Sequence, residues 1–311
     1  MQNFKDYNAY QPKTKTIVTI GTFDGVHIGH QKIISQLLEI TNQDNLESVI
    51  LTFFPHPRMV LQKDRSIKLI NTIEEKEVLL KKLGIDHLVV KEFTKDFSCY
   101  SALEFVEEIL VNKLNVAHVI IGHDHRFGKG READINDLVE FGKEYHFKVT
   151  EITAQEIDQV AVSSTKIRIA LKDGNIKTVN TYLGYNFMIT GKVTKGKGIG
   201  RQLNFPTANI KIAENYKLVP KQGAYIIKTV IEEKEIFGML NIGINPTVNG
   251  TSESIEAHFF DFDKDIYNKT IQIQFLERLR DEQKFESVAL LKEQLQKDKR
   301  VALQYIKQNH A

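Results

Sequence analysis

The hydrophobic pattern of this chain changes about halfway along, and this change limits the possible folds most strongly. In the first half, short apolar runs that look buried on both faces alternate with amphipathic stretches of helical spacing. The expected strands cover residues 16–20, 48–54, 87–90, 117–121 and 148–152. Such strands, each separated from the next by a helix, are typical of a parallel α/β sheet. We therefore expect a Rossmann-like α/β domain over residues 1–184.

The expected helices of this domain differ in how clearly they show a buried face. One expected helix begins after Gly29. Three others cover residues 72–83, 101–114 and 134–145. In the 72–83 helix, helical spacing predicts that Ile73, Val78, Leu79 and Leu83 face inward. In the 101–114 helix, it predicts that Leu103, Phe105, Val106 and Leu110 face inward.

The second half begins near residues 183–186 and has β-type runs separated by Gly, Pro, Asn or charged turns. Alternation such as I-Q-I-Q-F indicates half-exposed antiparallel strands. The expected strands cover residues 187–193, 224–231, 236–240, 255–260 and 270–275. One helix closes the chain, with Phe285, Val288, Leu291 and Leu295 at helical spacing. Residues 185–311 are therefore expected to form a small antiparallel β-barrel with a terminal helix.

Composition excludes several classes of protein. The 311 residues are 41% hydrophobic, which is enough for the cores of two domains. The 42 basic and 40 acidic residues nearly cancel, so the chain lacks the basic footprint of a nucleic-acid binder. One cysteine, Cys99, cannot form an internal disulfide or a four-cysteine zinc site. With no apparent secretory signal and no apolar run long enough for a bilayer, we expect a cytoplasmic protein.

The sequence G-T-F-D-G-V-H-I-G-H over residues 21–30 directly follows the first expected strand and leads into a helical pattern. Ligands of α/β sheets bind at this end of the strands, and a helix N-terminus attracts anions. His27 and His30 are three residues apart and can reach the same phosphate group, where they can stabilise charge during transfer. The motif is not a P-loop. The alternative is that both histidines only cap the helix or pack.

A partner motif lies late in the same domain, where V-S-S-T-K-I-R covers residues 162–168. Its hydroxyl groups can open a helix. Lys166 and Arg168 place positive charge where phosphates would bind. The alternative is an ordinary capped surface helix.

Two loops follow other strands of the expected sheet, at residues 52–58 and 122–131. The second combines glycines, cationic groups and an aromatic ring, a mixture that suits a planar ring joined to a phosphate. Its clustered histidines could also indicate a metal site. No close acidic partner or cysteine pair supports that alternative.

A second constellation lies in the C-terminal half. Residues 191–201 are rich in glycine and cations, and glycine N–H groups can cradle phosphates. Thr207 and Asn209 offer neutral oxygens suited to Mg²⁺ shared with ATP phosphates. Strand alternation places Glu256 on the same face as His258 and away from Ile255. The alternatives are a flexible hairpin with a Pro turn and an ordinary solvent-facing glutamate.

Taken together, these motifs resemble the family of bacterial bifunctional riboflavin kinases/FMN adenylyltransferases, also called FAD synthetases, across essentially the whole chain. The family's N-terminal motifs are G-x-F-D-G-V-H-x-G-H, F-x-P-H-P, G-x-[DN]-x-x-F-G and [IV]-S-S-T-x-[IL]-R, and all four occur here in order. H-x-G-H is shared by the nucleotidylyltransferase superfamily. The resemblance therefore implies a nucleotidylyltransferase-like N-terminal domain.

For this domain the resemblance implies that an FMN phosphate oxygen attacks the α-phosphorus of ATP, giving FAD and pyrophosphate. His27 and His30 would stabilise the ATP phosphates, and no protein nucleophile is required. The residues implied around ATP or the FMN phosphate are Gly21, Phe23, Asp24, Gly29, Asp124, Ser164, Thr165 and Arg168. The residues implied on the flavin side are Phe54, Pro55, Pro57, Arg126 and Phe127.

For the second half, G-R-x-L-x-F-P-T-A-N resembles the riboflavin kinase motif. The resemblance implies that Thr207 and Asn209 assist Mg–ATP and that Glu256 is the general base for the ribityl 5′-hydroxyl. Gly196, Gly198, Gly200 and Arg201 would close over the ATP phosphates. Arg280 and Phe285, in an R-x-E-x-x-F segment, would approach the flavin.

The implied cofactors and partners are small molecules. They are Mg²⁺, ATP as co-substrate, and riboflavin, FMN and FAD as substrates or products. We expect no nucleic-acid or membrane partner, and a monomer or weak homo-oligomer.

Four residues depart from the family pattern. Asn204 replaces a usual glycine, Asn245 a frequent arginine, and His123 and His125 an often-found glutamate and phenylalanine. The first two keep open an alternative in which only adenylyl transfer is active and the second half is a degenerate or regulatory kinase-like module. A tRNA-binding or synthetase-like protein is a further alternative, but no basic helical extension favours it.

Overall fold

The computed structural model describes residues 7–62, 67–122, 125–152, 162–195, 205–247 and 250–310. The chain divides into two compact units, Met1–Ser164 and Thr165–Ala311. Each unit is described by itself below. The expected domain boundary at 184/185 rests on the hydrophobic pattern and remains a prediction.

The first unit contains a five-stranded parallel sheet with strand order β3-β2-β1-β4-β5. The strands are β1 (Thr16–Ile20), β2 (Glu47–Phe54), β3 (His87–Glu92), β4 (Val116–Gly122) and β5 (Lys148–Ile152). Every pairing is parallel, so the expected parallel α/β architecture is confirmed.

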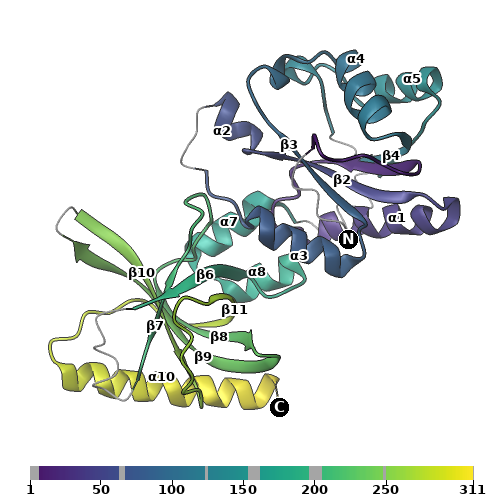
Figure 1. Cartoon of the computed structure of the whole chain (residues 1–311). Helices are drawn as coiled ribbons and strands as arrows, with labels where there is room; N and C mark the ends of the chain where they lie inside the picture. The colour runs from purple at the N-terminus through teal and green to yellow at the C-terminus, as the bar shows by residue number, and fades with distance from the viewer. Residues whose placement is uncertain are drawn as a thin grey trace. The chain divides into compact units, whose positions relative to one another are not determined.

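Helices cover both faces of this sheet. They are α1 (Ile28–Asp44), α2 (Pro57–Leu61), α3 (Ile73–Leu83), α4 (Ala102–Glu104), the π-helix Phe105–Lys113 and α5 (Ile135–Tyr145). Short 3₁₀ turns cover Phe97–Cys99 and Lys129–Arg131. In Figure 1, α4 and α5 lie on one side of the sheet, and α1 and α3 lie on the other.

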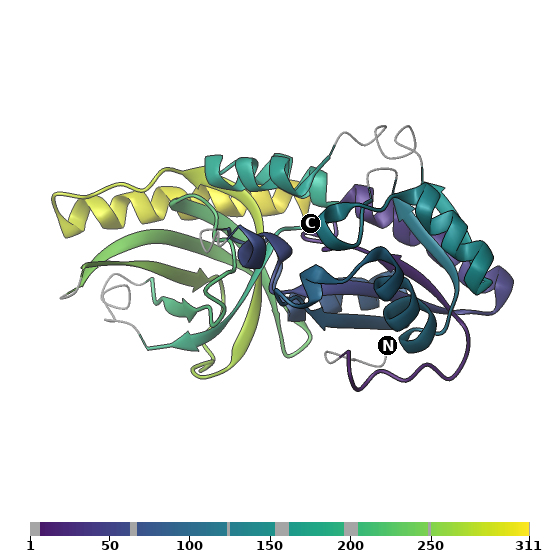
Figure 2. The same cartoon turned by 90° about the horizontal axis from the view of Figure 1, so that it is seen from above.

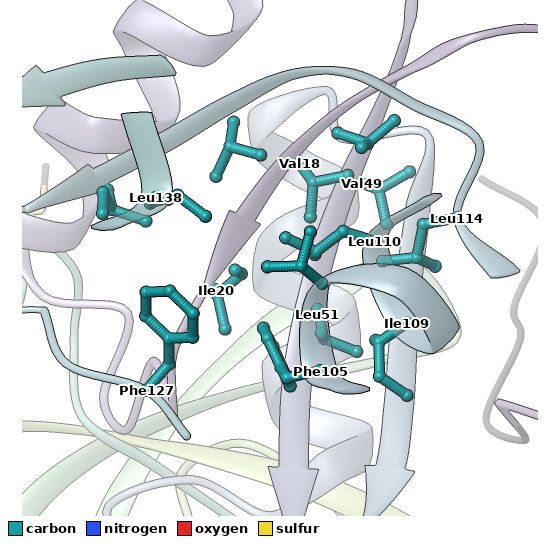
Figure 3. Close-up of a cluster of buried hydrophobic side chains, with 14 of the residues drawn as sticks. Val18, Ile20, Val49, Leu51, Phe105, Ile109, Leu110, Leu114, Phe127 and Leu138 are labelled. Carbon is teal, nitrogen blue, oxygen red and sulfur yellow. The ribbon is translucent and has the colours of Figure 1, made fainter. Parts of the chain in front are cut away.

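The main core of this unit lies on the sheet face covered by the π-helix and α5. Val18 and Leu51 from the central strands pack there with Phe105, Leu110 and Leu138, as Figure 3 shows. Each fully buried side chain of this size contributes roughly 1.5–3 kcal/mol of transfer free energy. Strand alternation turns the intervening residues to the opposite face, so both faces of the sheet are apolar.

Two residues expected to face inward do not. Val78 is 40% exposed and Leu103 is 44% exposed. In α3, Leu79 is buried as expected, but Glu75 and Lys76 also take buried positions, and counting apolar residues alone misplaces Val78. Leu103 lies in the single turn that precedes the π-helix. Within the π-helix, hydrogen bonds span five residues, as the one from the Leu114 N–H to Ile109 O shows. That wider winding rotates the buried face relative to an α-helix.

The second unit begins at the second residue of α7 (Ser164–Asp173). It contains α8 (Ile176–Leu183) and continues as a closed antiparallel barrel of order β10-β7-β6-β11-β8-β9. The strands are β6 (Met188–Thr194), β7 (Ala208–Lys211), β8 (Gly223–Ile231), β9 (Lys234–Thr247), β10 (Gly250–Phe259) and β11 (Thr270–Arg280). The expected barrel is confirmed. The short β7 follows a Pro-containing segment and was not among the expected strands.

The terminal helix α10 (Val288–Asn309) lies along the barrel, as Figure 2 shows. Its residues Leu291 and Leu295 pack against a barrel cluster, as expected. Of the other two expected positions, one is helical but exposed and one lies outside the helix. Val288 is 63% exposed, and Phe285 precedes the helix, whose N-cap is Ser287.

Asn180 of α8 joins this helix to the barrel. The Phe187 N–H donates to Asn180 Oδ1 at 2.7 Å, and Asn180 Nδ2 donates to Phe275 O at 2.9 Å. These hydrogen bonds explain why α8 groups with the second unit. Among the helices of the described ranges, none is both long and apolar enough to cross a membrane.

Candidate active sites

The order of the strands in the parallel sheet indicates where the first candidate site lies. From β1 the chain runs through β2 to β3 on one side of the sheet, and β4 and β5 lie on the other side. Ligands of open α/β sheets bind at such a switch point, at the carboxyl ends of the two strands where the order reverses. The turn at residues 21–30 leaves β1 there, and the loop at residues 122–131 leaves β4.

The backbone of the 21–30 turn adopts unusual angles. Phe23, Gly25 and Val26 have positive φ values of 44°, 90° and 38°. Such angles are rare for a β-branched residue and cluster at functional sites. The side chains of Phe23 and Val26 are buried and hold the turn in place. A Cβ at Gly21 would lie 3.2 Å from the Phe23 ring, so the turn is also tightly packed.

His27 is the N-cap of α1, and its Nδ1 accepts a hydrogen bond from the His30 N–H at 3.3 Å. In a neutral ring with Nδ1 as acceptor, the proton is assigned to Nε2. Burial lowers the pKa of His27 to about 4. At neutral pH the side chain is therefore an uncharged donor at the start of a helix. Gly29 is buried in the first turn of the same helix.

The ring of His30 stacks on that of His27, with centroids 3.7 Å apart and planes inclined by 15°. Burial, followed by the charges of His27 and Lys76, holds the pKa of His30 well below its usual range. Its buried Nδ1 has no hydrogen-bond partner within the part of the chain that the structure describes. Buried polar atoms are normally paired, so this nitrogen has unused hydrogen-bonding capacity among the described residues.

Asp24 and Ser164 tie three segments together around this turn. Asp24 Oδ1 accepts hydrogen bonds from the backbone N–H groups of Ile70 at 2.9 Å and Asn71 at 3.3 Å. The carboxylate thus anchors the segment that leads into α3. Ser164 Oγ donates to Asp24 O at 2.9 Å. The V-S-S-T motif and the H-x-G-H turn, which are 140 residues apart, therefore meet.

Thr165 and Arg168 follow Ser164 on α7 and belong to the second unit. Their contact with ATP stays a prediction. Asp124 and His123 lie outside the described residues.

The residues expected on the flavin side lie in two places. Phe54 ends β2, and Pro55 and Pro57 lead into α2, where all three are partly buried. Phe127 is 7% exposed and packs in the core, with its ring centroid 5.7 Å from that of Phe105. Arg126 is half-exposed, and its Nη2 lies 3.9 Å from Asp134 Oδ2. A flavin contact for these residues remains a prediction.

Lys76 belongs to this site, although no sequence pattern predicted it. Lys76 on α3 is 4% exposed. Its Nζ donates to Thr22 O at 2.6 Å, and Thr52 Oγ1 lies 3.4 Å away. Burial lowers the pKa of Lys76 to about 8, and the Asp24 carboxylate acts in the opposite direction. Counting apolar residues alone treats Lys76 as a surface residue of this charged helix, so the sequence analysis found no signal for its role.

The second candidate site lies on the barrel where β7 and β10 pair. Thr207 Oγ1 donates to Glu256 Oε2 at 3.3 Å. Asn209 is the register partner of Glu256, so their side chains share a face of the sheet. The expected trio thus converges. Glu256 and His258 are partly exposed and alternate with buried Ile255, as strand alternation predicts.

Arg280 fixes the end of β11 to α10. Its Nε and Nη2 each lie 2.9 Å from Asp298 Oδ2, and Gln294 Nε2 donates to the other oxygen at 2.7 Å. Asp298 is 5% exposed, so this is a buried ion pair. The Arg280 guanidinium also lies 5.8 Å from the centroid of the Phe285 ring. The observed role of Arg280 is to hold this segment, and flavin contact by either residue stays a prediction.

Glu282 lies in the same R-x-E-x-x-F segment, and the sequence analysis assigned it no role. A Cβ added to Gly243 would collide with the Glu282 carboxylate and lie 3.1 Å from Asn241 Nδ2. Asn241 is the register partner of Glu256 on β9. The segment after β11 therefore reaches the sheet face that carries the expected general base.

Several expected kinase residues lie outside the described parts of the chain. They are Gly196, Gly198, Gly200, Arg201 and Asn204. Asn245 lies within β9, but only its backbone is described.

The two units define a class of protein: a nucleotide-binding α/β domain with a histidine pair at its switch point, followed by a barrel with a Thr–Asn–Glu site. Comparison with known families makes this specific. Residues 10–166 match the FAD synthetase family, and residues 183–306 match the riboflavin kinase family. The chain belongs to the bifunctional riboflavin kinase/FMN adenylyltransferase family.

Curated relatives cover nearly the whole chain. The bifunctional riboflavin kinase/FMN adenylyltransferase of Buchnera aphidicola subsp. Acyrthosiphon pisum is 36% identical, over 96% of both chains. That of Listeria monocytogenes is 38% identical, over 91% of this chain and 90% of the relative. That of Escherichia coli K12 is 34% identical, over 94% of both. Among solved structures, a Streptococcus pneumoniae protein titled as a macrolide-efflux protein superposes with a TM-score of 0.84 at 28% identity, over 99% of both chains.

Both halves match their own enzyme family. This supports the bifunctional interpretation over an adenylyltransferase with a degenerate kinase-like module.

Proposed function

We propose that the barrel phosphorylates riboflavin to FMN, that the α/β unit adenylylates FMN to FAD, and that ATP is the co-substrate of both steps. The observation that carries this proposal is that the expected residues converge in each unit separately. Ser164 meets the turn that bears His27 and His30. Thr207 and Asn209 meet Glu256 in the barrel.

In the adenylyl-transfer step, a phosphate oxygen of FMN attacks the α-phosphorus of ATP, and pyrophosphate leaves. Both histidines have lowered pKa values, so they are neutral at pH 7 and act as hydrogen-bond donors. The Nε2–H of His27 and the free N–H groups at the start of α1 face negative charge that grows on the phosphates. Catalysis here consists of positioning and charge stabilisation, and the protein forms no covalent bond.

In the kinase step, the ribityl 5′-hydroxyl attacks the γ-phosphorus of ATP, and ADP leaves. Glu256 accepts the hydroxyl proton. The hydrogen bond from Thr207 holds the Glu256 carboxylate in place, and β7 holds Asn209 beside it. His258 Nδ1 lies 2.9 Å from Pro206 O and so fixes the backbone just before Thr207.

The kinase residues fit Mg²⁺ through oxygen donors. A hydroxyl and an amide oxygen suit an ion that keeps most of its coordination to ATP phosphates and water. Thr207 and Asn209 would hold it, and bound Mg²⁺ neutralises charge on the transferred phosphoryl group. Within the described ranges, no group of three or more His, Cys, Asp or Glu side chains could hold a metal ion.

The proposal also includes the predicted flavin contacts of both units, a cytoplasmic location and a monomer or weak oligomer. Family membership supports the flavin contacts, and the single cysteine supports the cytoplasmic location.

A product assay tests the function. Purified protein is incubated with ATP and Mg²⁺ plus either riboflavin or FMN, and the flavins are separated by chromatography. We expect FMN and then FAD from riboflavin, and FAD from FMN. Formation of FAD from FMN without any conversion of riboflavin would restore the adenylyltransferase-only alternative.

A further inference from the structure

A buried ammonium group lies directly beneath the 21–30 turn. Lys76 Nζ donates to the carbonyl of Thr22 inside the turn and lies 3.4 Å from Thr52 Oγ1 on β2. Thr22 follows the end of β1 by two residues, and Thr52 precedes the end of β2 by two, so both oxygens lie near the edge of the sheet where the first site was located. Lys76 therefore connects α3 to the part of the sheet where ATP is expected.

The charge of Lys76 is not cancelled by a direct partner. The described residues provide its ammonium with two neutral oxygens and no ion-paired carboxylate. Burying a cation in this way costs free energy, because water is removed without a compensating opposite charge. A protein that keeps such a group at an anion-binding turn gains a strong local positive potential there.

The charged neighbours of Lys76 come from three elements. Asp24, in the turn, raises the pKa of Lys76, but its Oδ1 is engaged by two backbone N–H groups. His30, on α1, is neutral, and the Lys76 charge contributes to the lowering of its pKa. On α3 itself, the Glu75 carboxylate accepts from the Thr72 N–H in a capping box. The histidine pair thus supplies hydrogen bonds, and Lys76 supplies the full charge.

We propose that Lys76 is a positioning residue of the adenylyl-transfer site: its ammonium fixes the 21–30 turn through Thr22 and places a positive charge behind the histidine pair, where the ATP phosphates bind. This inference rests on the proposed adenylyltransferase function. Lys76 is close enough to His30 for its charge to lower the pKa of that ring, and the ring of His30 in turn stacks on that of His27.

The role of the charge has a pH signature. With a pKa of about 8, Lys76 is mostly protonated at pH 7 and loses its charge as the pH rises through that value. Bound phosphates stabilise the ammonium and shift this loss upward. The specificity constant for ATP in FAD formation, which reports the free enzyme, should therefore fall on the alkaline side from about pH 8.

The experiment compares Lys76→Met, Lys76→Arg and a control, Lys82→Met, which removes an exposed lysine of the same helix. FAD formation from FMN and ATP is measured from pH 6 to pH 10 in the full chain. Riboflavin phosphorylation by the same protein reports on the barrel, and urea unfolding reports on the folding of the α/β unit. Lys76→Met should lower kcat/KM for ATP by about 10- to 100-fold, as expected for a lost charge-assisted interaction. Kinase activity should be unchanged in every variant.

Two readouts separate a charge from mere packing. In Lys76→Met the alkaline decrease near pH 8 should disappear, and in Lys76→Arg it should move to higher pH because the guanidinium stays charged. The pKa of His30, followed by NMR, should rise in Lys76→Met and not in Lys82→Met. The proposal is overturned if Lys76→Met keeps kcat/KM within twofold, or if Lys76→Arg keeps the decrease near pH 8.

If Lys76→Met loses both activities, the Lys76→Arg profile alone decides. If the unsubstituted chain forms no FAD from FMN, the proposed function itself fails. If it forms FAD and Lys76→Met matches it, only the role of Lys76 is refuted.

Discussion

Replacing Glu256 with glutamine is expected to abolish most of the riboflavin kinase activity while leaving the fold and the adenylyltransferase activity intact. Glutamine has the same shape and keeps a carbonyl oxygen for the Thr207 hydroxyl, which lies 3.3 Å from the carboxylate. The side chain is partly exposed on β10. A substitution there should change the free energy of unfolding by no more than about 0.5 kcal/mol.

Kinase activity is lost because the substituted side chain cannot serve as a general base. Glutamine cannot accept the proton of the attacking 5′-hydroxyl, and a general base typically contributes about 10²- to 10⁴-fold. The expected decrease in kcat corresponds to about 3–5 kcal/mol of activation free energy. Because the amide keeps the contact with Thr207, the KM for ATP should change little.

The assay measures FMN from riboflavin and FAD from FMN in the same preparation, with urea unfolding as the stability check. The neighbouring carboxylate variant Glu253→Gln, on the same strand at an exposed position, serves as the matched control. Kinase activity within threefold of the unsubstituted chain would refute the role of Glu256 as the base. An equal loss of FAD formation would refute the separation of the two sites.

Four further predictions follow from the geometry. His30→Ala should reduce FAD formation by about 10²-fold or more and spare FMN formation, measured as initial rates; equal loss of both would contradict it. The depressed pKa of His27, about 4 against an unfolded value near 6.5, means that the unfolded chain binds more protons between these values. The free energy of unfolding should therefore fall by about 3 kcal/mol as the pH drops from 6.5 to 4, and a flat profile in urea titrations would argue against burial of this ring. Gly243→Ala should raise the KM for riboflavin, because its Cβ displaces Glu282, and should leave FAD formation from FMN unchanged. Asn180→Ala should lower the free energy of unfolding by about 2–3 kcal/mol, since it leaves the Phe187 N–H without its acceptor, and a change under 0.5 kcal/mol in urea unfolding would show that α8 is not held this way.

The sequence predicts the sheet well because its strands are buried on both faces. The run at Thr16–Ile20 is fully buried in the structure and has the expected bounds. Such a run has few alternatives once helices flank it. The barrel strands were predicted by alternation, but β7 has only four residues and follows a Pro-containing segment, so no alternation could be recognised.

Sequence patterns fail where polar groups are buried or where winding departs from an α-helix. The buried face of α3 contains Glu75 and Lys76, which an apolar count places outside. Glu75 is buried because it completes the capping box with Thr72, and Lys76 because it reaches the 21–30 turn. The π-helix likewise shifts the face on which Leu103 was expected. These features depend on partners far away in the sequence.

In the candidate sites too, residues in local motifs were predicted and long-range contacts were not. Residues with a chemical motif, such as His27 with His30, were found because motif and position at a strand end agree. Arg280 was assigned to the flavin from its motif, but its observed partner is Asp298 on α10. No local sequence pattern predicts this ion pair, because it forms only when the terminal helix packs on the barrel.

Complementation between two variants can show whether one chain holds two independent sites. His30→Ala and Glu256→Gln proteins are mixed with riboflavin, ATP and Mg²⁺, and FAD is measured by chromatography. We expect little FAD from either protein alone. The mixture should form FAD, because the first protein supplies FMN and the second adenylylates it. A mixture that forms no FAD, although each protein still performs its own single step, would contradict two sites that work separately on a released FMN.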